Sequence, residues 1–169
     1  MKSNLILTGM PGAGKSTVGV ILAKVLGYDF VDIDILIAKR QGMPLQDIID
    51  TNGVDVFLKI EEQEACLLDA NKTVIATGGS VVLSDRAMAH LKQSGTCVYL
   101  DIPLDVLENR LLNMKTRGIA ASPGTTLTDI YNARRSYYKR YADHTIHCGT
   151  RSMEEIVAEI VHLAQFSAK

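Results

Sequence analysis

A glycine-rich run near the start of the chain has the residues and spacing of a phosphate-binding loop. Residues 9–17 read Gly-Met-Pro-Gly-Ala-Gly-Lys-Ser-Thr, which matches the Walker A pattern G-x-x-x-x-G-K-S. In such a loop, backbone N–H groups surround the phosphates, and the helix that follows presents its positive end to them. Lys15 would reach the β- and γ-phosphates, and the hydroxyl of Ser16 would bind Mg²⁺. The sequence therefore predicts a nucleoside triphosphate site rather than a glycine-rich turn that binds nothing.

Two aspartates follow where acids could serve the same site. Asp32 and Asp34 flank Ile33 at the end of a stretch, residues 29–34, that we expect to be a strand. Alternate residues of a strand share a face, so both carboxylates could face one cavity. One acid could hold the water shell of Mg²⁺ while the other accepts the proton of a substrate hydroxyl. The alternative is a pair of solvated acids in a turn.

Three further features each allow two interpretations. Residues 78–80 (Gly-Gly-Ser) follow a predicted strand, where glycines either let a ligand approach the backbone or form a plain turn. Arg117 lies in a polar stretch long enough to be a lid, where it could supply a mobile cation or stay solvated. Arg134 falls on the apolar stripe of a predicted helix, so its charge either meets an anion inside the protein or reaches solvent beyond a packed stem.

The elements that must position these residues alternate between strands and helices. An apolar run at residues 4–8 predicts the first strand, and an i, i+3, i+4 stripe over residues 18–26 predicts a helix closed by Gly27. Further strands are expected at residues 29–34, 72–77, 96–101 and 145–148, and further helices at about 35–40, 44–49, 55–69, 84–91, 103–113, 125–142 and 153–164. This alternation predicts an α/β protein with a parallel sheet covered on both faces.

Two details of these elements can be tested directly. On the helix over residues 55–69 we expect Leu67 on the same side as Phe57 and Glu64, with Glu61 beside them. We expect Gly95 in the turn that precedes the fourth strand.

Length, charge and cysteine usage indicate an ordinary globular protein. The 169 residues fit one domain. Lys and Arg number 18 against 19 Asp and Glu, and a net charge of −1 gives no general attraction to nucleic acid or anionic membranes. No apolar run is long enough to span a membrane, and the chain enters a strand too early for a signal peptide. The three cysteines lack metal-binding spacing, so we expect free thiols in a reducing cytoplasm. We also expect a monomer that acts on a small molecule.

Taken together, these motifs resemble those of the shikimate kinase family. The similar residues are collinear from Leu5 to about Ala164: the phosphate loop, Asp32-x-Asp34, Gly53-x-x-x-Phe57, Glu61, residues 74–79, Arg110, Arg117, and Arg134 followed by Tyr138, Ala142 and Asp143. The resemblance implies a single three-layer P-loop kinase domain over residues 1–169, with a five-stranded parallel sheet in the order 2-3-1-4-5 and helices on both faces. It also implies a substrate-binding subdomain at about residues 33–61 and a lid at about residues 112–124. The implied reaction is the ATP- and Mg²⁺-dependent phosphorylation of shikimate to shikimate 3-phosphate, a step of aromatic amino acid biosynthesis.

The resemblance also implies a role for individual residues. Those implied in catalysis are Lys15, Asp34 and Arg117. Those implied in nucleotide binding are Gly12, Ala13, Gly14, Lys15, Ser16, Thr17 and, against the adenine, Arg110. Those implied in substrate binding are Asp34, Glu61, Gly78, Gly79, Ser80 and Arg134. Those implied in metal binding are Ser16 and Asp32.

The sequence departs from the family pattern mainly at the acceptor end. Leu58 stands where the family has an arginine that binds the substrate carboxylate, and Ser80 replaces the third glycine of the substrate loop. Arg134 alone would then hold a carboxylate, and Glu61 would lack the cation that usually lies beside it. The alternatives to shikimate are therefore another hydroxylated metabolite, such as a hydroxy amino acid or gluconate, and a nucleotide-binding module without catalysis.

Overall fold

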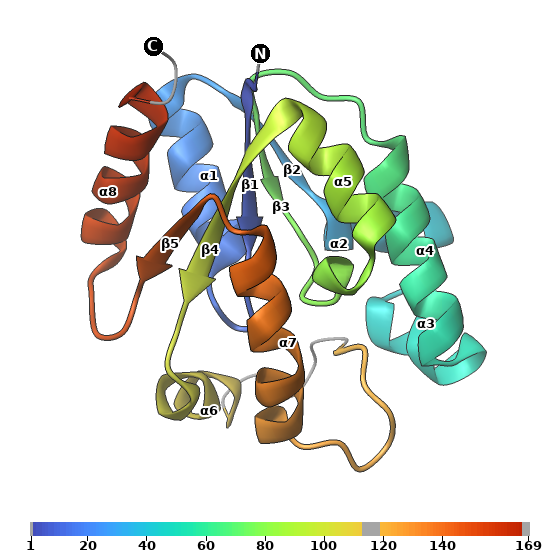
Figure 1. The fold of residues 1–169 in the computed structure, drawn as a ribbon. Helices are drawn as coiled ribbons and strands as arrows, with labels where there is room; N and C mark the ends of the chain where they lie inside the picture. Colours follow the sequence, from blue (N-terminus) through green and yellow to red (C-terminus); the bar gives the residue numbers. More distant parts are fainter. Residues whose placement is uncertain (1, 113–118, 167–169) are drawn as a thin grey trace.

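A five-stranded parallel sheet forms the centre of the protein (Figure 1), in a computed structural model that describes residues 2–112 and 119–166. The strands are β1 (Asn4–Thr8), β2 (Asp29–Asp32), β3 (Thr73–Ala76), β4 (Gly95–Asp101) and β5 (His144–His147). Their order is β2-β3-β1-β4-β5, and every neighbouring pair is parallel. The central strand β1 is buried along its whole length, as expected for an apolar strand covered on both faces. Both the α/β class and the predicted strand order are confirmed.

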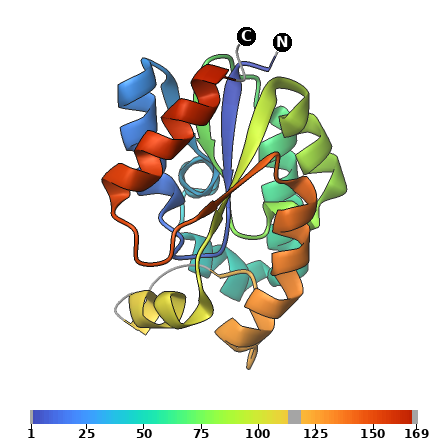
Figure 2. The same cartoon turned by 60° about the vertical axis from the view of Figure 1, so that its left-hand side comes forward.

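Helices cover the two faces of the sheet and the end where the strands finish. On one face lie α1 (Lys15–Leu26) and α8 (Met153–Phe166), and on the other lie α4 (Val54–Leu67), α5 (Asp85–Ser94) and α7 (Leu127–Tyr141) (Figure 2). The remaining helices are α2 (Ile33–Gln41), α3 (Leu45–Asn52), the short 3₁₀ helix η1 (Val81–Leu83) and α6 (Leu104–Leu112). The segments that follow the carboxyl ends of β1, β2 and β3 therefore meet at one end of the sheet, where open α/β folds bind their ligands.

The helix ends have identifiable local causes. Gly27 adopts the left-handed conformation with φ 68° and donates its N–H to Ala23, which ends α1 as predicted. Ser84 accepts a hydrogen bond from the N–H of Ala87 and starts α5. The side chain of Thr126 starts α7 in the same way, within a reciprocal capping box. These caps fix where each helix begins relative to the turns that carry the site.

The predicted strand over residues 29–34 is wrong at its end. The strand stops at Asp32, whose carboxylate accepts hydrogen bonds from the N–H groups of Asp34 and Ile35 and so caps α2. Asp34 therefore lies in the first turn of a helix. The argument that two aspartates share one face of a strand does not apply, and any convergence of their side chains has to come from the helix cap.

Two smaller predictions also fail. Leu67 is 68% exposed, because the buried side of α4 runs through Phe57, Glu61 and Glu64 and continues to Leu68 rather than to Leu67. Gly95 is the first residue of β4, not part of a turn. A Cβ at this position would lie 2.5 Å from Cδ1 of Ile6, so a larger residue here would force the buried Ile6 side chain to move.

Two further predictions concern segments with special roles. Residues 33–61, the predicted substrate-binding subdomain, contain α2, α3 and the first half of α4, and their role stays a prediction. Within the predicted lid, residues 113–118, including Arg117, lie outside the described residues. Residues 119–124 contain neither helix nor strand. In the described part of the chain, no helix is both long enough and apolar enough to cross a membrane.

Candidate active site

The loop between β1 and α1 curls tightly because it contains glycines at positions that other residues rarely tolerate. Gly12 and Gly14 have φ angles of 82° and 88°, in the left-handed region. A Cβ at Gly9, whose φ is 148°, would lie 2.9 Å from the carbonyl oxygen of Leu100. Gly14 caps α1 without a side chain, so the first turn of the helix offers its N–H groups and positive end to a ligand. This is the backbone arrangement that binds phosphate.

Lys15 lies over the centre of this loop. Its Nζ donates hydrogen bonds to the carbonyl oxygens of Gly9 at 2.7 Å and Met10 at 2.9 Å, and the residue is only 8% exposed. A γ-phosphate bound by the loop would meet this ammonium group directly. The loop therefore holds the lysine ready at the position where phosphates would bind.

The other predicted nucleotide-binding residues lie around the same loop. Gly12 and Ala13 are buried within it, while Ser16 and Thr17 are exposed at the start of α1. Arg110 comes from α6 and donates a hydrogen bond to the carbonyl oxygen of Gly12 at 3.3 Å. An arginine 98 residues away in the sequence thus borders the phosphate loop, and its proposed contact with adenine stays a prediction.

The two residues predicted to hold Mg²⁺ are in direct contact. The hydroxyl of Ser16 donates to Oδ2 of Asp32 at 2.5 Å, and Asp32 is 8% exposed, which excludes the alternative of a solvated acid. The other oxygen, Oδ1, caps α2 and fixes the carboxylate in place. A hydroxyl and a carboxylate are the hard oxygen ligands that Mg²⁺ prefers. The donor set fits the metal, although the role stays a prediction.

Two carboxylates converge on Gly78, at the turn that follows β3. A Cβ built on Gly78 would lie 1.9 Å from Oε1 of Glu61 and 2.7 Å from Oδ1 of Asp34. No side chain fits in that space, so only glycine allows both acids to reach the backbone here. The structure thus brings together an acid from α2 and an acid from α4 that the sequence separates by 27 positions.

The next residue of the turn connects the acceptor end to the phosphate loop. A Cβ on Gly79 would lie 2.9 Å from Cδ of Pro11 in the phosphate loop and 3.4 Å from a guanidinium nitrogen of Arg134. The carbonyl oxygen of Gly79 accepts a hydrogen bond from the hydroxyl of Tyr138 at 2.5 Å. The turn after β3 is therefore packed between the phosphate loop and helix α7.

Arg134 points into the protein, as its place on the apolar stripe of α7 suggested. It is 5% exposed, and its guanidinium donates a hydrogen bond to the carbonyl oxygen of Ala120. The alternative, in which the charged head reaches solvent, is therefore wrong. A buried guanidinium next to the turn after β3 is suited to bind an anionic group of a ligand.

Glu61 is the least satisfied buried polar group in the described part of the chain. Oε2 accepts a hydrogen bond from the hydroxyl of Ser80 at 2.5 Å, whereas Oε1 is buried without a hydrogen-bond partner. Burial raises the pKa of the carboxyl from its ordinary value of about 4.5 to about 8, despite the Ser80 hydrogen bond. In this pKa the nearby charge of Asp34 acts in the same direction as burial, while Arg134 and Lys15 act against it.

A cleft of about 360 Å³ lies between α4 and η1 and reaches Glu61. Leu58 and Ser80, the departures from the family pattern at the acceptor end, both line it. Its charged lining consists of three carboxylates, Asp55, Glu61 and Glu62, and one ammonium group, that of exposed Lys59. The lining thus contains more acidic than basic side chains, with Glu62 paired to Arg86 at 3.7 Å.

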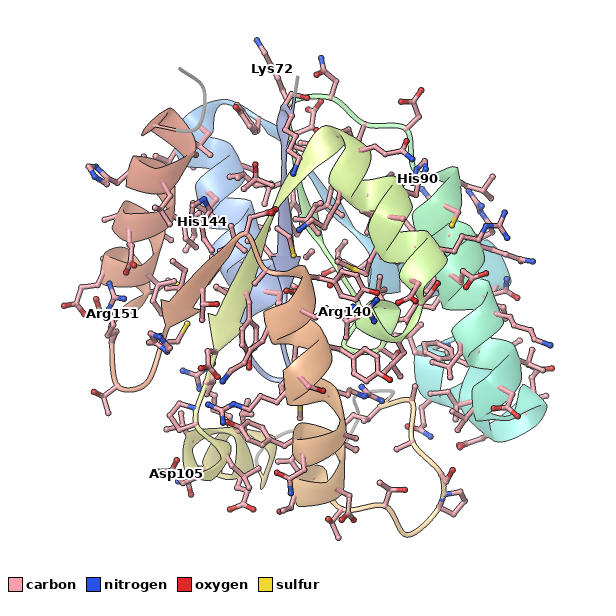
Figure 3. All side chains as sticks on the ribbon, viewed as in Figure 1. Lys72, His90, Asp105, Arg140, His144 and Arg151 are labelled. Carbon is pink, nitrogen blue, oxygen red and sulfur yellow. The ribbon has the colours of Figure 1, made fainter. Side chains whose placement is uncertain are left out.

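Residues outside this end of the sheet contribute little to the site. Figure 3 labels His90 and His144: His144 is the first residue of β5, at the amino ends of the strands, and His90 bonds to the carbonyl oxygen of Leu68. Arg140 extends from α7 to an ion pair with Asp85, 3.4 Å away, at the start of α5 (Figure 3).

Sequence reasoning missed three contacts of the site. Pro11 supports Gly79, the carbonyl of Ala120 holds Arg134, and the hydroxyl of Tyr138 holds the turn. Only Tyr138 had a usable signal, since it follows Arg134 by one helical turn on the same stripe. Proline and a loop carbonyl have no residue-type signal for such contacts.

The strand order of the sheet and the loop between β1 and α1 define the class of the protein as a P-loop kinase fold. The particular family follows from comparison with known proteins: a family model described as shikimate kinase matches residues 11–165, and the chain belongs to the shikimate kinase family. Shikimate kinase of Sulfurihydrogenibium sp. is 33% identical over 159 residues, which cover 94% of this chain and 95% of that protein. A structure of shikimate kinase from Acinetobacter baumannii in complex with shikimate superimposes with a TM-score of 0.90 at 29% identity, covering 99% of this chain and 95% of that one.

Other relatives are much longer proteins. Threonine synthase-like 1 of Homo sapiens is 38% identical over 160 residues, which cover 94% of this chain but 22% of that protein. The chain thus spans about a fifth of the length of the Threonine synthase-like 1 proteins that it matches and nearly the whole of the shikimate kinases.

The burial of Glu61 predicts a specific pH dependence of stability. Between about pH 4.5 and pH 8 the folded protein keeps a proton on Glu61 that the unfolded chain releases, so this group lowers the stability of the folded state as the pH rises through that window. Replacing it by Glu61→Gln removes the titration. We expect the stability of the variant relative to wild type to increase with pH by on the order of a few kcal/mol. Urea unfolding of both proteins across this pH range measures the difference, and a difference that does not change with pH would contradict the assignment.

Proposed function

We propose that the chain transfers the γ-phosphoryl group of ATP to a hydroxyl group of a small carboxylic acid. In this reaction the hydroxyl oxygen of the acceptor forms a bond to the γ-phosphorus, and the bond between that phosphorus and the bridging oxygen of ADP breaks. The hydroxyl proton passes to the carboxylate of Asp34. The products are ADP and a phosphate monoester.

One observation carries this proposal: the turn after β3 touches both halves of the site. Gly79 packs against Pro11 of the phosphate loop, while Gly78 faces Oδ1 of Asp34. An acceptor bound at this turn would therefore lie next to the position of the γ-phosphate, with a carboxylate beside its hydroxyl. Such positioning supplies much of the rate enhancement in phosphoryl transfer.

The donor residues have the chemistry that this reaction needs. Lys15 would stabilise the negative charge on the γ-phosphate as it is transferred. Mg²⁺, when bound, neutralises charge on the β- and γ-phosphates. Ser16 and Asp32 are the residues that would hold it, and Arg117 is proposed as a second cation on the transferring group.

Arg134 is the proposed binding site for the carboxylate of the acceptor. It is buried next to Gly79 and already fixed through Ala120, so little side-chain entropy would be lost on binding. Shikimate is the acceptor that the family resemblance predicts, and it carries both a carboxylate and hydroxyl groups. Leu58 supplies no charge where the family has a second arginine, which argues for weakened binding of shikimate.

Several alternatives remain as predictions from the sequence. Relatives named shikimate kinase and relatives named Threonine synthase-like 1 match this chain to a similar degree, so the names do not select one acceptor. No observation favours gluconate in particular. A module without catalysis is less well supported, since Lys15, Ser16 and Asp32 form an ordered donor site. The monomeric state and the cytoplasmic location also stay predictions.

The main experiment is a coupled assay of ADP release with shikimate, gluconate and small hydroxy acids as acceptors. We expect at least one acceptor to raise ADP release well above background hydrolysis and to yield a phosphate monoester. Lys15→Met should lower kcat by about 10²–10³-fold, because it removes a charge that acts on the transition state. If ATP binds but no acceptor raises turnover, the module without catalysis becomes the better interpretation.

Leu58→Arg tests how well the acceptor cleft fits shikimate. The substitution adds a guanidinium to the wall that also contains Glu61. A charge-assisted hydrogen bond to the shikimate carboxylate should raise kcat/KM for shikimate by about 10–150-fold. Leu58→Met serves as the control without charge. If Leu58→Arg leaves kcat/KM for shikimate unchanged, the wild-type protein already binds this carboxylate by another route.

The metal site predicts a separate effect on the requirement for Mg²⁺. Asp32→Asn keeps one oxygen that can still cap α2, but an amide NH₂ replaces the oxygen that faces Ser16, and the negative charge is lost. We expect the Mg²⁺ concentration for half-maximal rate to rise by about tenfold or more, with a smaller change in the rate at saturating Mg²⁺. Titration of Mg²⁺ at fixed ATP measures this shift, and equal Mg²⁺ requirements in the two proteins would remove Asp32 from the metal site.

A further inference from the structure

We propose that the acceptor carries an ammonium group that binds to Oε1 of Glu61, which makes it a small hydroxy amino acid. The inference rests on the proposed function, because it names the acceptor of that same site. The ammonium would bind Glu61, the carboxylate would bind Arg134, and the hydroxyl would face Asp34.

The first argument is a contrast between two buried carboxylates of one helix. Glu64 of α4 is 6% exposed, and its Oε1 accepts a hydrogen bond from Arg40 at 2.8 Å. Glu61 is buried even more deeply, at 2% exposure, yet its Oε1 has no hydrogen-bond partner. A buried carboxylate oxygen without a partner is costly, so a partner from outside the described protein atoms would be stabilising.

The second argument is the direction in which this oxygen points. Oε1 lies against the backbone of Gly78, next to Oδ1 of Asp34, and not toward the outer surface of α4. This is the turn that the proposed reaction uses. Because Oε1 is fully buried against this backbone, a ligand in the acceptor site would reach it once the Glu61 side chain moved off Gly78.

The third argument is that residue 58 supplies no cationic side chain for Glu61. On α4, residue 58 lies one turn before Glu61, where a cationic side chain could pair with it, but Leu58 cannot. Of the residues lining the adjoining cleft, only exposed Lys59 is cationic, against three carboxylates. An ammonium group has three N–H donors and a full positive charge, which matches the unpaired oxygen in both respects.

The fourth argument is that Glu61, Asp34 and Arg134 all lie around the backbone of two consecutive residues, 78 and 79. Gly78 faces the two carboxylates, and Gly79 faces the guanidinium of Arg134. An α-amino acid places its ammonium and carboxylate on one carbon atom, and a hydroxyl on a short side chain lies a few bonds away. The ammonium and hydroxyl of a small hydroxy amino acid would thus face the two acids at Gly78, while its carboxylate would face Arg134 at Gly79.

Burial also makes the selectivity depend on pH. The pKa of Glu61, raised to about 8 by its burial and by Asp34, leaves this carboxyl largely protonated at neutral pH, even with Arg134 and Lys15 nearby. A bound ammonium would favour the carboxylate form, whereas an uncharged group at the same place would not. Binding of the amine would therefore release the proton of Glu61, and the preference for an amine over its absence should grow as the pH rises toward 8.

Matched pairs of acceptors test the inference directly. The pairs are L-homoserine with 4-hydroxybutanoate, L-serine with 3-hydroxypropanoate, and L-threonine with 3-hydroxybutanoate, with shikimate as the reference. The members of each pair differ only in the amino group. We expect at least one amino acid to exceed its partner in kcat/KM by about 10–150-fold, the range for a charge-assisted contact.

Two variants and one control assign the effect to Glu61. Glu61→Gln should bring the ratio within a pair close to one while changing the rate with the deaminated member much less. Glu64→Gln, which alters the buried carboxylate that already has a partner, should keep the wild-type ratio. Leu58→Arg gives Glu61 a cation from its own helix and should lower the ratio without removing the carboxylate, so it serves if Glu61→Gln does not fold.

Failure of the inference can be distinguished from failure of the proposed function. If acceptors are phosphorylated but paired acids differ by less than about threefold, or if the ratio survives in Glu61→Gln, the ammonium site is refuted while phosphoryl transfer stands. If no acceptor is phosphorylated, the proposed function fails, and calorimetric binding of the same pairs decides the inference. Tighter binding of the amino acid that is lost in Glu61→Gln supports it, and equal binding or none overturns it.

Discussion

The contact of a buried carboxylate with a glycine backbone is the constraint on which the acceptor end of the site depends. Oε1 of Glu61 occupies the space that a side chain would need at Gly78, and Oδ1 of Asp34 borders the same space. Any larger residue at this position would displace one of the two acids. Ser80, two residues further along, then fixes the other oxygen of Glu61. The turn after β3 therefore determines where both acids point.

This constraint also connects the two halves of the site. The residue between the two contacts, Gly79, packs on Pro11 of the phosphate loop and accepts a hydrogen bond from Tyr138. A shift of the turn would move the acceptor relative to the phosphate loop and would break a buried hydrogen bond at the same time. Misplacement by about 1 Å can cost phosphoryl transfer roughly 10²-fold, so a rigid turn is a functional requirement.

The sequence predicted the donor end of the site well because phosphate recognition there is local. Nine consecutive residues, 9–17, contain the glycines, the lysine and the hydroxyl, and the strand and helix on either side have clear periodic patterns. The alternation of strands and helices predicted the layers for the same reason. The error at Asp34 arose where two local signals compete: the alternating pattern of residues 29–34 favours a strand, while the capping side chain of Asp32 starts a helix. Pattern alone does not decide between them.

The acceptor end could be predicted only in part, because it is assembled from distant segments. Arg134 was found from its place on an apolar stripe, which indicates burial but not a partner. That its guanidinium meets the carbonyl of Ala120, or that the hydroxyl of Tyr138 meets a carbonyl 59 residues away, depends on packing that no local pattern encodes. The missing partner of Glu61 is likewise visible only when every neighbour is in place.

The departures from the family pattern at the acceptor end, Ser80 and Leu58, can be explained as changes around a single side chain. Ser80 adds a hydroxyl that a glycine would lack, and this hydroxyl satisfies Oε2 of Glu61. Leu58 omits a cation that could have satisfied Oε1 from the same helix. Ser80 thus gives Oε2 a hydrogen-bond partner, whereas Leu58 leaves Oε1 to be paired by a ligand. Neither change touches the phosphate loop, so the chemistry of the donor end can stay constant while the charge required of the acceptor changes.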